Sequence, residues 1–279
     1  MDKSGVIIWR MKMNKKERLK SDFISKLKSF TSTLTKNKII VPPIKIQGIK
    51  TKLVPLILAN VNIEDKKRWV EPFLGSGVVA FNANPKTALL CDINPHIINF
   101  YQSIKEKEID HSVFYLHLSK EGKKLSEKGD EHYYFVRERF NKENNPLDFL
   151  FLNRSCFNGM IRFNKKLLFN VPYGHKPNRF SKAYITKIVN QVKNVQFLIH
   201  SNNWVFKCQD FRTTLKEGNL NDFIYCDPPY IGRHVDYYDS WDEKEERELF
   251  SLLQNSRADY MLSTWDNNKY RNNEYINKI

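Results

Sequence analysis

The stretch FIYCDPPYIG, residues 223–232, sets an apolar run directly against an acid, two prolines and a tyrosine. The segment from Phe223 to Cys226 is typical of a buried β-strand, and the prolines end it because they lack the N–H groups that a strand ladder needs. The sequence therefore predicts a carboxylate, a rigid corner and an aromatic ring together at one strand end.

Strands and helices alternate on both sides of this stretch. Further strands are predicted at 68–73, 86–92, 204–209 and 259–264, and helices at 77–83, 95–106, 111–155 and 243–254. This alternation favours an α/β fold with an open, mostly parallel sheet covered on both faces. A block of over 100 residues between the strands at 86–92 and 204–209 breaks the alternation, so we interpret it as an inserted module.

The composition indicates a folded protein with an anionic partner. With 279 residues and 41% hydrophobic content, the chain forms one large domain, or one domain with an insertion. The net charge of +15 favours nucleic acid before a membrane, although a lysine-rich surface is the alternative. Four scattered cysteines argue against a zinc site and for a reduced, cytosolic interior. No apolar run reaches the ~18–20 residues of a membrane span.

A second motif, EPFLGSGVVAFN at residues 71–82, follows the first predicted strand. Gly75 and Gly77 allow a backbone turn that approaches a ligand, but the pattern lacks the third glycine of a dinucleotide site and the lysine of a P-loop. Asp92 ends the next strand about 20 residues later, where an acid can bind both ribose hydroxyls. Together they predict a nucleoside-bearing cofactor; a plain tight turn, with Asp92 capping the next helix, is the alternative.

The corner at Asp227 suits methyl transfer to an exocyclic amine of a base. Such an amine is a poor nucleophile, and two hydrogen-bond acceptors without a competing donor would direct its lone pair at the methyl group. Asp227 and the carbonyl of Pro228 supply two acceptors, and neither Pro228 nor Pro229 has an N–H. Tyr230 supplies a face on which a planar base can stack.

The motifs EPFLGSG (71–77), CDINP (91–95) and DPPY (227–230), in that order, resemble the Dam-type, D12-class DNA N6-adenine methyltransferases. PPIKIQGIKTKLVP (42–55) is similar to the family's N-terminal cofactor segment, and residues 151–174 to its DNA-reading hairpin. The resemblance implies a Rossmann-like methyltransferase sheet, the cofactor S-adenosyl-L-methionine and no metal. It also implies a duplex DNA substrate with a GATC-like or GATATC-like site, a flipped-out adenine, protection from a restriction enzyme, and a cytoplasmic, DNA-associated monomer.

The resemblance assigns roles to matching positions. It implies that the cofactor is held by Lys50, Glu71, Pro72, Phe73, Gly75, Ser76, Gly77, Asp92, Asp210, Phe211 and Asp227. The implied catalytic residues are Asp227, Pro228, Pro229 and Tyr230. Ile46 and Gln47 stand where the family often has an aromatic residue, so one packing contact to the cofactor is expected to differ.

Residues 151–180 contain no Asp or Glu, in a chain that holds 31 such acids. Lysine and arginine there would neutralise phosphates, and a β-ribbon is narrow enough to enter the major groove. The predicted DNA contacts are Arg154, Asn158, Arg162, Asn164, Lys165, Lys166, Asn170, Lys176, Arg179 and Arg233. An ordinary surface hairpin is the alternative. Leu167 and Leu168 stand where a glycine-bearing turn is common, which indicates either a DNA wedge or sequence drift.

Three parts are expected: a basic helical extension at 1–38, a catalytic domain at 39–106 and 200–279, and a target-recognition module at 107–199. The extension has apolar residues at helical spacing from Leu19 to Phe30. One further helix is predicted at 267–279. Family members usually continue with a strand hairpin, so we expect a fragment, a split gene product or a poorly soluble enzyme, with its C-terminal strands missing. The strand at 259–264 would then be an apolar edge prone to association.

Two other functions stay open. A truncated, catalytically inactive relative would bind DNA without methylating it. A relative that methylates RNA or a protein amide would use similar chemistry, but such proteins generally carry Asn rather than Asp at position 227, and the acid-free segment favours duplex DNA.

Overall fold

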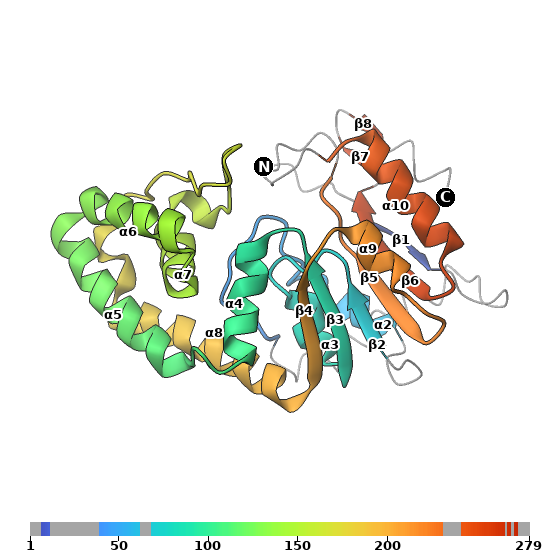
Figure 1. The fold of residues 1–279 in the computed structure, drawn as a ribbon, viewed down its shortest axis with the longest axis horizontal. Helices are drawn as coiled ribbons and strands as arrows, with labels where there is room; N and C mark the ends of the chain where they lie inside the picture. The colour runs from blue at the N-terminus through green and yellow to red at the C-terminus, as the bar shows by residue number, and fades with distance from the viewer. Residues whose placement is uncertain are drawn as a thin grey trace.

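The computed structural model describes residues 7–11, 39–61, 68–230, 241–265, 267–268 and 271–272. Two regions lie next to each other in Figure 1: an α/β half built on a twisted sheet and a helical half that contains α5, α6 and α7. The long helix α8 (Lys182–Ser201) returns the chain from the helical half to the sheet. The α/β fold class predicted from the alternation of strands and helices is confirmed.

In the described residues, six strands form the central sheet in the order β1-β6-β5-β2-β3-β4. Five of them are mutually parallel, and β1 pairs with β6 in the antiparallel sense. Their bounds are β1 (Ile7–Met11), β2 (Arg68–Glu71), β3 (Thr87–Asp92), β4 (Asn203–Cys208), β5 (Asp222–Cys226) and β6 (Asp259–Trp265). All residues of β5 are buried, as expected for a strand covered on both faces.

Neighbouring residues along the strands belong to different apolar clusters. Trp69 of β2 belongs to one cluster with residues of α2 (Val54–Ala59), α3 (Val78–Ala83) and α4 (Pro95–Lys105). Val70 belongs to the other with residues of α9 (Phe211–Lys216) and α10 (Glu243–Asn255). Because successive side chains of a strand point to opposite faces, these clusters are the two covered sides of the sheet.

The strand order reverses at β2, which pairs with β3 on one side and with β5 on the other. From β2 the chain moves outward to β3 and β4, then returns across the sheet to β5 and continues to β6. In open α/β sheets, ligands bind in the crevice at the carboxyl ends of the strands beside such a reversal. The residues that follow β2 and β5 are therefore expected to meet there.

The predicted helices of the inserted block are present as α5 (His111–Lys128), α6 (Asp130–Glu143) and α7 (Pro146–Ser155). The segment that follows, residues 156–180, is called here the recognition loop. It contains the short helices η1 (Phe157–Gly159) and η2 (Pro177–Phe180) and two isolated antiparallel bridges, Cys156 to Tyr173 and Phe163 to Phe169. One apolar cluster runs from Trp69 to Phe151 and Phe169, so the helical half shares its core with the sheet. The domain boundaries at 107 and 199 stay predictions.

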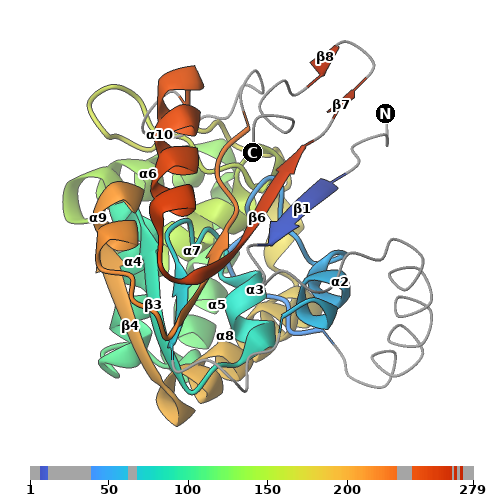
Figure 2. The ribbon, with the colours of Figure 1, turned by 90° about the vertical axis from the view of Figure 1, so that its right-hand side faces the viewer.

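The secondary structure near both ends of the chain differs from the sequence-based predictions. Ile7–Met11 pairs with β6 in the register Ile7 to Trp265, and β1 lies beside β6 in Figure 2. The prediction that β6 is an open edge is therefore wrong, because β1 covers it. The helix predicted at 267–279 does not begin at its described residues, since β7 (Asn267–Asn268) pairs with β8 (Arg271–Asn272). The helix predicted from Leu19 to Phe30 lies outside the described residues.

Candidate active site

The glycine motif forms a tight loop between β2 and α3. Gly75 has φ 51° and Gly77 has φ 73°, both in the left-handed region that favours glycine. A Cβ on Gly77 would lie 2.6 Å from the ring of Phe81, so the turn also needs glycine for space. The Leu74 N–H donates to the carbonyl of Cys91 at 2.8 Å, which ties the loop to the end of β3.

Asp92 at the end of β3 fixes this loop. Its carboxylate accepts hydrogen bonds from the backbone N–H groups of Gly75 and Asn94, both at 2.8 Å. Burial raises the pKa of Asp92 to about 6, although both hydrogen bonds favour the carboxylate. The helix cap itself is Asn94, whose side chain accepts from the His96 N–H. Asp92 thus orders the loop, and its carboxylate also lines the cavity described next.

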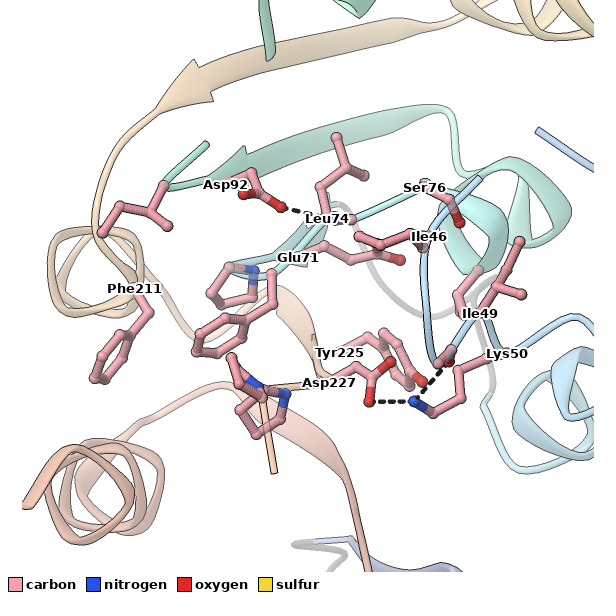
Figure 3. A pocket seen from close by; sticks show the side chains of 18 of the residues that line it. Ile46, Ile49, Lys50, Glu71, Leu74, Ser76, Asp92, Phe211, Tyr225 and Asp227 are labelled. Atoms are coloured by element: carbon pink, nitrogen blue, oxygen red, sulfur yellow. Dashed lines mark hydrogen bonds and ion pairs between the residues drawn. The ribbon is translucent and has the colours of Figure 1, made fainter. Parts of the chain in front are cut away.

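A cavity of about 220 Å³ occupies the crevice predicted by the strand order. Its lining joins the glycine loop, Asp92 and Asp227, and it includes all predicted cofactor and catalytic residues except Gly77. In the view of Figure 3, Asp92 and Phe211 lie at one end of the cavity and Lys50 and Asp227 at the other. The cavity therefore brings together segments that are more than 150 residues apart in the sequence.

Three aromatic rings line the end of the cavity near Asp92. Phe73 packs against Phe211 with ring centroids 5.4 Å apart, and Trp241 lies 5.5 Å from each of them. The Asp210 carboxylate is paired with Arg212, which donates to it from its backbone N–H at 2.8 Å and from its guanidinium at 2.9 Å. Trp241 was not predicted as a site residue, since it follows the DPPY motif and comes just before α10 without belonging to a motif of its own.

Lys50 and Asp227 form an ion pair at the other end. The Lys50 Nζ lies 2.7 Å from Asp227 Oδ1 and 5.1 Å from the centre of the Tyr230 ring, and the Tyr230 hydroxyl donates to the same oxygen at 3.4 Å. Burial opposes the charge of Lys50, but Asp227 and Tyr230 outweigh it, so the pKa of Lys50 is raised. The expectation of a corner without a competing donor is therefore wrong for Oδ1, because Lys50 occupies that oxygen.

Two further groups surround Asp227. The register Cys226 to Leu262 places Ser263 of β6 beside Asp227. Burial raises the pKa of Asp227, although Lys50 favours the carboxylate. Glu71 is 1% exposed and accepts a hydrogen bond from the Trp69 Nε1–H at 2.8 Å. Burial, together with the nearby Asp227 charge, raises the pKa of Glu71 to about 8. Ser263 was missed because its sequence neighbours form an ordinary apolar strand.

The segment 43–50 carries Lys50 and is held from the helical half. Buried Asn153 of α7 bonds the backbone of Lys45 in both directions: the Lys45 N–H donates to Oδ1 at 2.8 Å and Nδ2 donates to the Lys45 carbonyl at 2.9 Å. Ile46 and Gln47 line the cavity, where an aromatic residue is common in the family that the motifs resemble. The fold thus fixes this cavity wall through an asparagine outside the sheet.

Comparison with known proteins identifies the family. The pattern of the D12 class N6 adenine-specific DNA methyltransferases matches residues 47–279. The chain belongs to this family. The type II methyltransferase M.MjaIII of Methanocaldococcus jannaschii is 35% identical over 208 residues, 68% of each chain. The DNA adenine methylase of Haemophilus influenzae is 34% identical over 198 residues, 68% of this chain and 63% of that protein. M.FokI of Planomicrobium okeanokoites is 28% identical over 254 residues, 86% of this chain and 38% of that protein.

Membership in this family implies a methyl donor and a DNA substrate. No helix in the described residues is long and apolar enough to span a membrane. The described part of the chain contains no group of three His, Cys, Asp or Glu side chains that could hold a metal ion.

The recognition loop exposes most of the predicted DNA contacts of this methyltransferase. Exposed side chains are those of Asn158, Asn164, Lys165, Lys166 and Lys176, and half-buried ones are those of Arg162, Asn170 and Arg179. Arg162 donates to the Asn170 side chain at 2.8 Å, so these two residues act as one unit. Arg233 lies outside the described residues.

Arg154 differs from the other predicted DNA contacts because its side chain is only 4% exposed. It donates hydrogen bonds to the Pro43 carbonyl and, at 2.6 Å, to the Gln191 side chain. A buried guanidinium that is already bonded has little surface to offer a phosphate. The prediction of Arg154 as a DNA contact is therefore wrong, and Arg154 is a structural anchor between α7, α8 and the 43–50 segment.

Proposed function

We propose that this protein transfers the methyl group of S-adenosyl-L-methionine to the N6 amine of adenine in a specific site of duplex DNA. The observation that carries the proposal is the single cavity that joins the glycine loop, Asp92 and the Asp227-Pro228-Pro229-Tyr230 corner. Family membership supports the reaction class. A GATC-like or GATATC-like site and protection from a restriction enzyme are part of the proposal.

The residues present fit the proposed cofactor. The rings of Phe73, Phe211 and Trp241 offer flat apolar surface to an adenine, and the Asp92 carboxylate keeps lone pairs for ribose hydroxyls beside the two N–H groups that it binds. The glycine loop lets the backbone approach the methionine part. When bound there, the cofactor supplies an electrophilic methyl group on a sulfonium.

Asp227 and the Pro228 carbonyl would accept the two N–H bonds of the adenine amine, with Oδ2 as the carboxylate acceptor because Lys50 occupies Oδ1. Tyr230 would stack on the base, and Lys50 would hold the carboxylate ionised and in place. These contacts align the amine lone pair with the methyl group, which is a contribution of proximity and orientation. After transfer, the surplus amine proton leaves to water, so the proposal needs no histidine base.

A base inside a duplex cannot reach this corner, so the adenine must leave the stack. The exposed amides and lysines of the recognition loop, Asn158, Asn164, Lys165, Lys166 and Lys176, with Arg162, Asn170 and Arg179, would hold the flanking duplex. The proposal also includes that the enzyme is cytoplasmic, associates with DNA and acts as a monomer.

Incubation with tritiated S-adenosyl-L-methionine and plasmid DNA tests the activity, and sequencing of modified bases identifies the site. Wild-type protein should label adenine, and Asp227→Asn should lower the transfer rate by about a hundredfold, a loss typical of one preorganised electrostatic contact. Asn keeps the size of Asp, and DNA binding should persist in the variant. No label in DNA with wild-type protein that still binds DNA would instead support the inactive DNA-binding relative.

A further inference from the structure

Arg212 lies beside the cavity, next in the chain to two residues of its lining, Asp210 and Phe211. Its backbone N–H donates to the Asp210 carboxylate at 2.8 Å, and its guanidinium donates to the same carboxylate at 2.9 Å. The central carbon of the guanidinium lies 4.4 Å from the centre of the Phe211 ring. One side chain outside the lining therefore contacts two residues of the cavity wall.

The same guanidinium also binds the first two turns of α10. Its Nε lies 2.8 Å from a carboxylate oxygen of Glu248, and its Nη2 lies 3.5 Å from one of Glu245. Glu245 is itself part of the cavity lining, and Trp241 of the lining comes just before α10. Arg212 thus joins the start of α9 to the start of α10, and both of these ends carry residues of the cavity wall.

The position of the Phe211 ring depends on such contacts between elements. Phe211 is the first residue of α9, which has only six residues, and helices this short are not stable alone in water. Its ring is 4% exposed and lies 5.4 Å from the ring of Phe73 and 5.5 Å from that of Trp241. The three rings come from three different segments, so α9 must be held against α10 for them to meet.

The charges around Arg212 make this junction depend on one cation. The guanidinium faces three acids, Asp210, Glu245 and Glu248, whose side chains are 34%, 21% and 41% exposed. A single ion pair at such exposure contributes little, but a guanidinium shared by several carboxylates forms a network. Without it, three carboxylates would lie near one another, and their repulsion would oppose the contact between α9 and α10.

We infer that Arg212 is a positioning residue of the cofactor site, which holds Asp210, Phe211 and α10 in the arrangement that binds the adenosine part of S-adenosyl-L-methionine. The inference rests on the proposed function and adds to it a residue outside the cavity lining. Arg212 would act through the wall and not by contact with the cofactor. Its loss should therefore raise the cofactor Kd and KM and leave kcat at saturating cofactor close to the wild-type value.

Calorimetric titration of wild-type protein and Arg212→Gln with S-adenosyl-L-methionine and with S-adenosyl-L-homocysteine tests the inference. The two ligands share the adenosine part, and only the first carries a sulfonium charge. A displaced wall should weaken both ligands by the same factor, about tenfold for the loss of a network of ion pairs. Methylation of plasmid DNA should show the same factor in the cofactor KM, with kcat and the KM for DNA within about twofold of wild type.

The matched control is Arg247→Gln, which removes the same group from an exposed position of α10, where Arg247 pairs with Glu243 at 3.3 Å. It should keep both affinities at the wild-type values. Glu248→Gln removes the shortest link from Arg212 to α10 and should weaken both ligands about threefold. The double variant Arg212→Gln/Glu248→Gln should bind no more weakly than Arg212→Gln, because both changes break the same link.

Arg212→Lys keeps the charge without the planar fork that reaches two carboxylates, so it should show an intermediate loss. It decides the question if circular dichroism shows that Arg212→Gln does not fold.

Wild-type affinity for both ligands in the folded Arg212 variants would overturn the inference, and so would an equal loss in Arg247→Gln. A lower kcat with an unchanged cofactor KM would overturn it as well. If the wild-type protein bound neither ligand, the proposed cofactor would be wrong, and this inference would fall together with the proposed function.

Discussion

Two acidic side chains and one lysine line the same end of the cavity: Glu71, Asp227 and Lys50. Lys50 and Asp227 form an ion pair at 2.7 Å, whereas Glu71 is 1% exposed and faces no positive partner as close among the described residues. Burial and the Asp227 charge raise the pKa of Glu71 to about 8. In the protein alone, Glu71 therefore holds a proton at neutral pH, and the charges at this end of the cavity balance.

This proton makes stability depend on pH. A carboxyl whose pKa is raised on folding binds more protons in the folded than in the unfolded state, so its stabilising effect is complete below its ordinary pKa and is lost as pH rises toward 8. Through Glu71, the unfolding free energy should fall by up to about 1.4 kcal/mol per pH unit. Glu71→Gln keeps an acceptor for Trp69 and should lack this dependence. Urea unfolding at pH 5 and pH 8 measures both proteins.

The control for this comparison is Glu127→Gln, a substitution of an exposed glutamate on α5. Its stability difference from wild type should be the same at both pH values. Glu71→Gln should become more stable than wild type as pH rises. A constant difference between wild type and Glu71→Gln across this range would contradict a protonated Glu71.

Residue types at strand ends were the most predictable part of the cavity. Gly75, Asp92 and Asp227 each follow an apolar strand, and parallel strands bring such positions to one edge of a sheet. Trp241 and Ser263 could not be found in this way. Their place beside the cavity depends on how α10 and β6 pack, and no short sequence pattern encodes that packing.

At the scale of elements, three asparagine side chains bind the backbone of irregular segments. Asn82, Asn141 and Asn153 each exchange two hydrogen bonds with one backbone residue, and their partners are Ile40, Phe169 and Lys45. A side-chain amide paired in this way replaces a neighbouring strand, so it satisfies backbone groups outside the sheet. Asn153 thereby supports the wall of the cavity, and Asn141 supports the recognition loop.

Asn153→Leu should weaken cofactor binding. The variant has a similar side-chain volume but leaves the N–H and carbonyl of Lys45 without their partners, at a cost of about 1–3 kcal/mol for each unsatisfied group. The segment that carries Ile46 and Lys50 should then be less well fixed. Calorimetric titration with S-adenosyl-L-methionine should show at least a tenfold loss of affinity.

Asn141→Leu is the matched control, since it removes the same two-bond pattern from Phe169 in the recognition loop. It should weaken DNA binding and leave cofactor affinity near the wild-type value. Equal effects of both variants on cofactor affinity would mean that the asparagines act only through global stability.

Much of the secondary structure was predictable from the apolar pattern, although the long helix α8 was missed. The strands from β2 to β6 and the helices α3 to α7 and α10 follow such patterns, and the structure has them at the expected places. The strands Ile7–Met11, Asn267–Asn268 and Arg271–Asn272 were not predicted. A short strand depends on the partner that covers it, and the partner of β1 lies about 250 residues further along the chain.

At the scale of the whole molecule, β1 adds an antiparallel strand beside β6, the strand that follows the Asp227 corner in the chain. β6 pairs with β5 on one side and with β1 on the other, in the registers Phe223 to Asp259 and Ile7 to Trp265. Edge strands with open hydrogen-bonding groups tend to pair with other chains. β1 therefore covers the edge of β6 and becomes the edge strand of the described sheet, a pairing that the sequence pattern of residues 1–38 did not indicate.

Removal of residues 2–11 should expose the edge of β6 and cause self-association. The backbone groups of β6 that now pair with Ile7–Met11 would be free to pair with a second molecule. Sedimentation should show concentration-dependent oligomers, and thermal unfolding should begin at a lower temperature than in the full chain. Removal of residues 2–6 alone keeps β1 and serves as the control, which should behave as the full chain does. A 2–11 deletion that stays monomeric and equally stable would show that β6 tolerates an open edge, and that β1 is dispensable for the sheet.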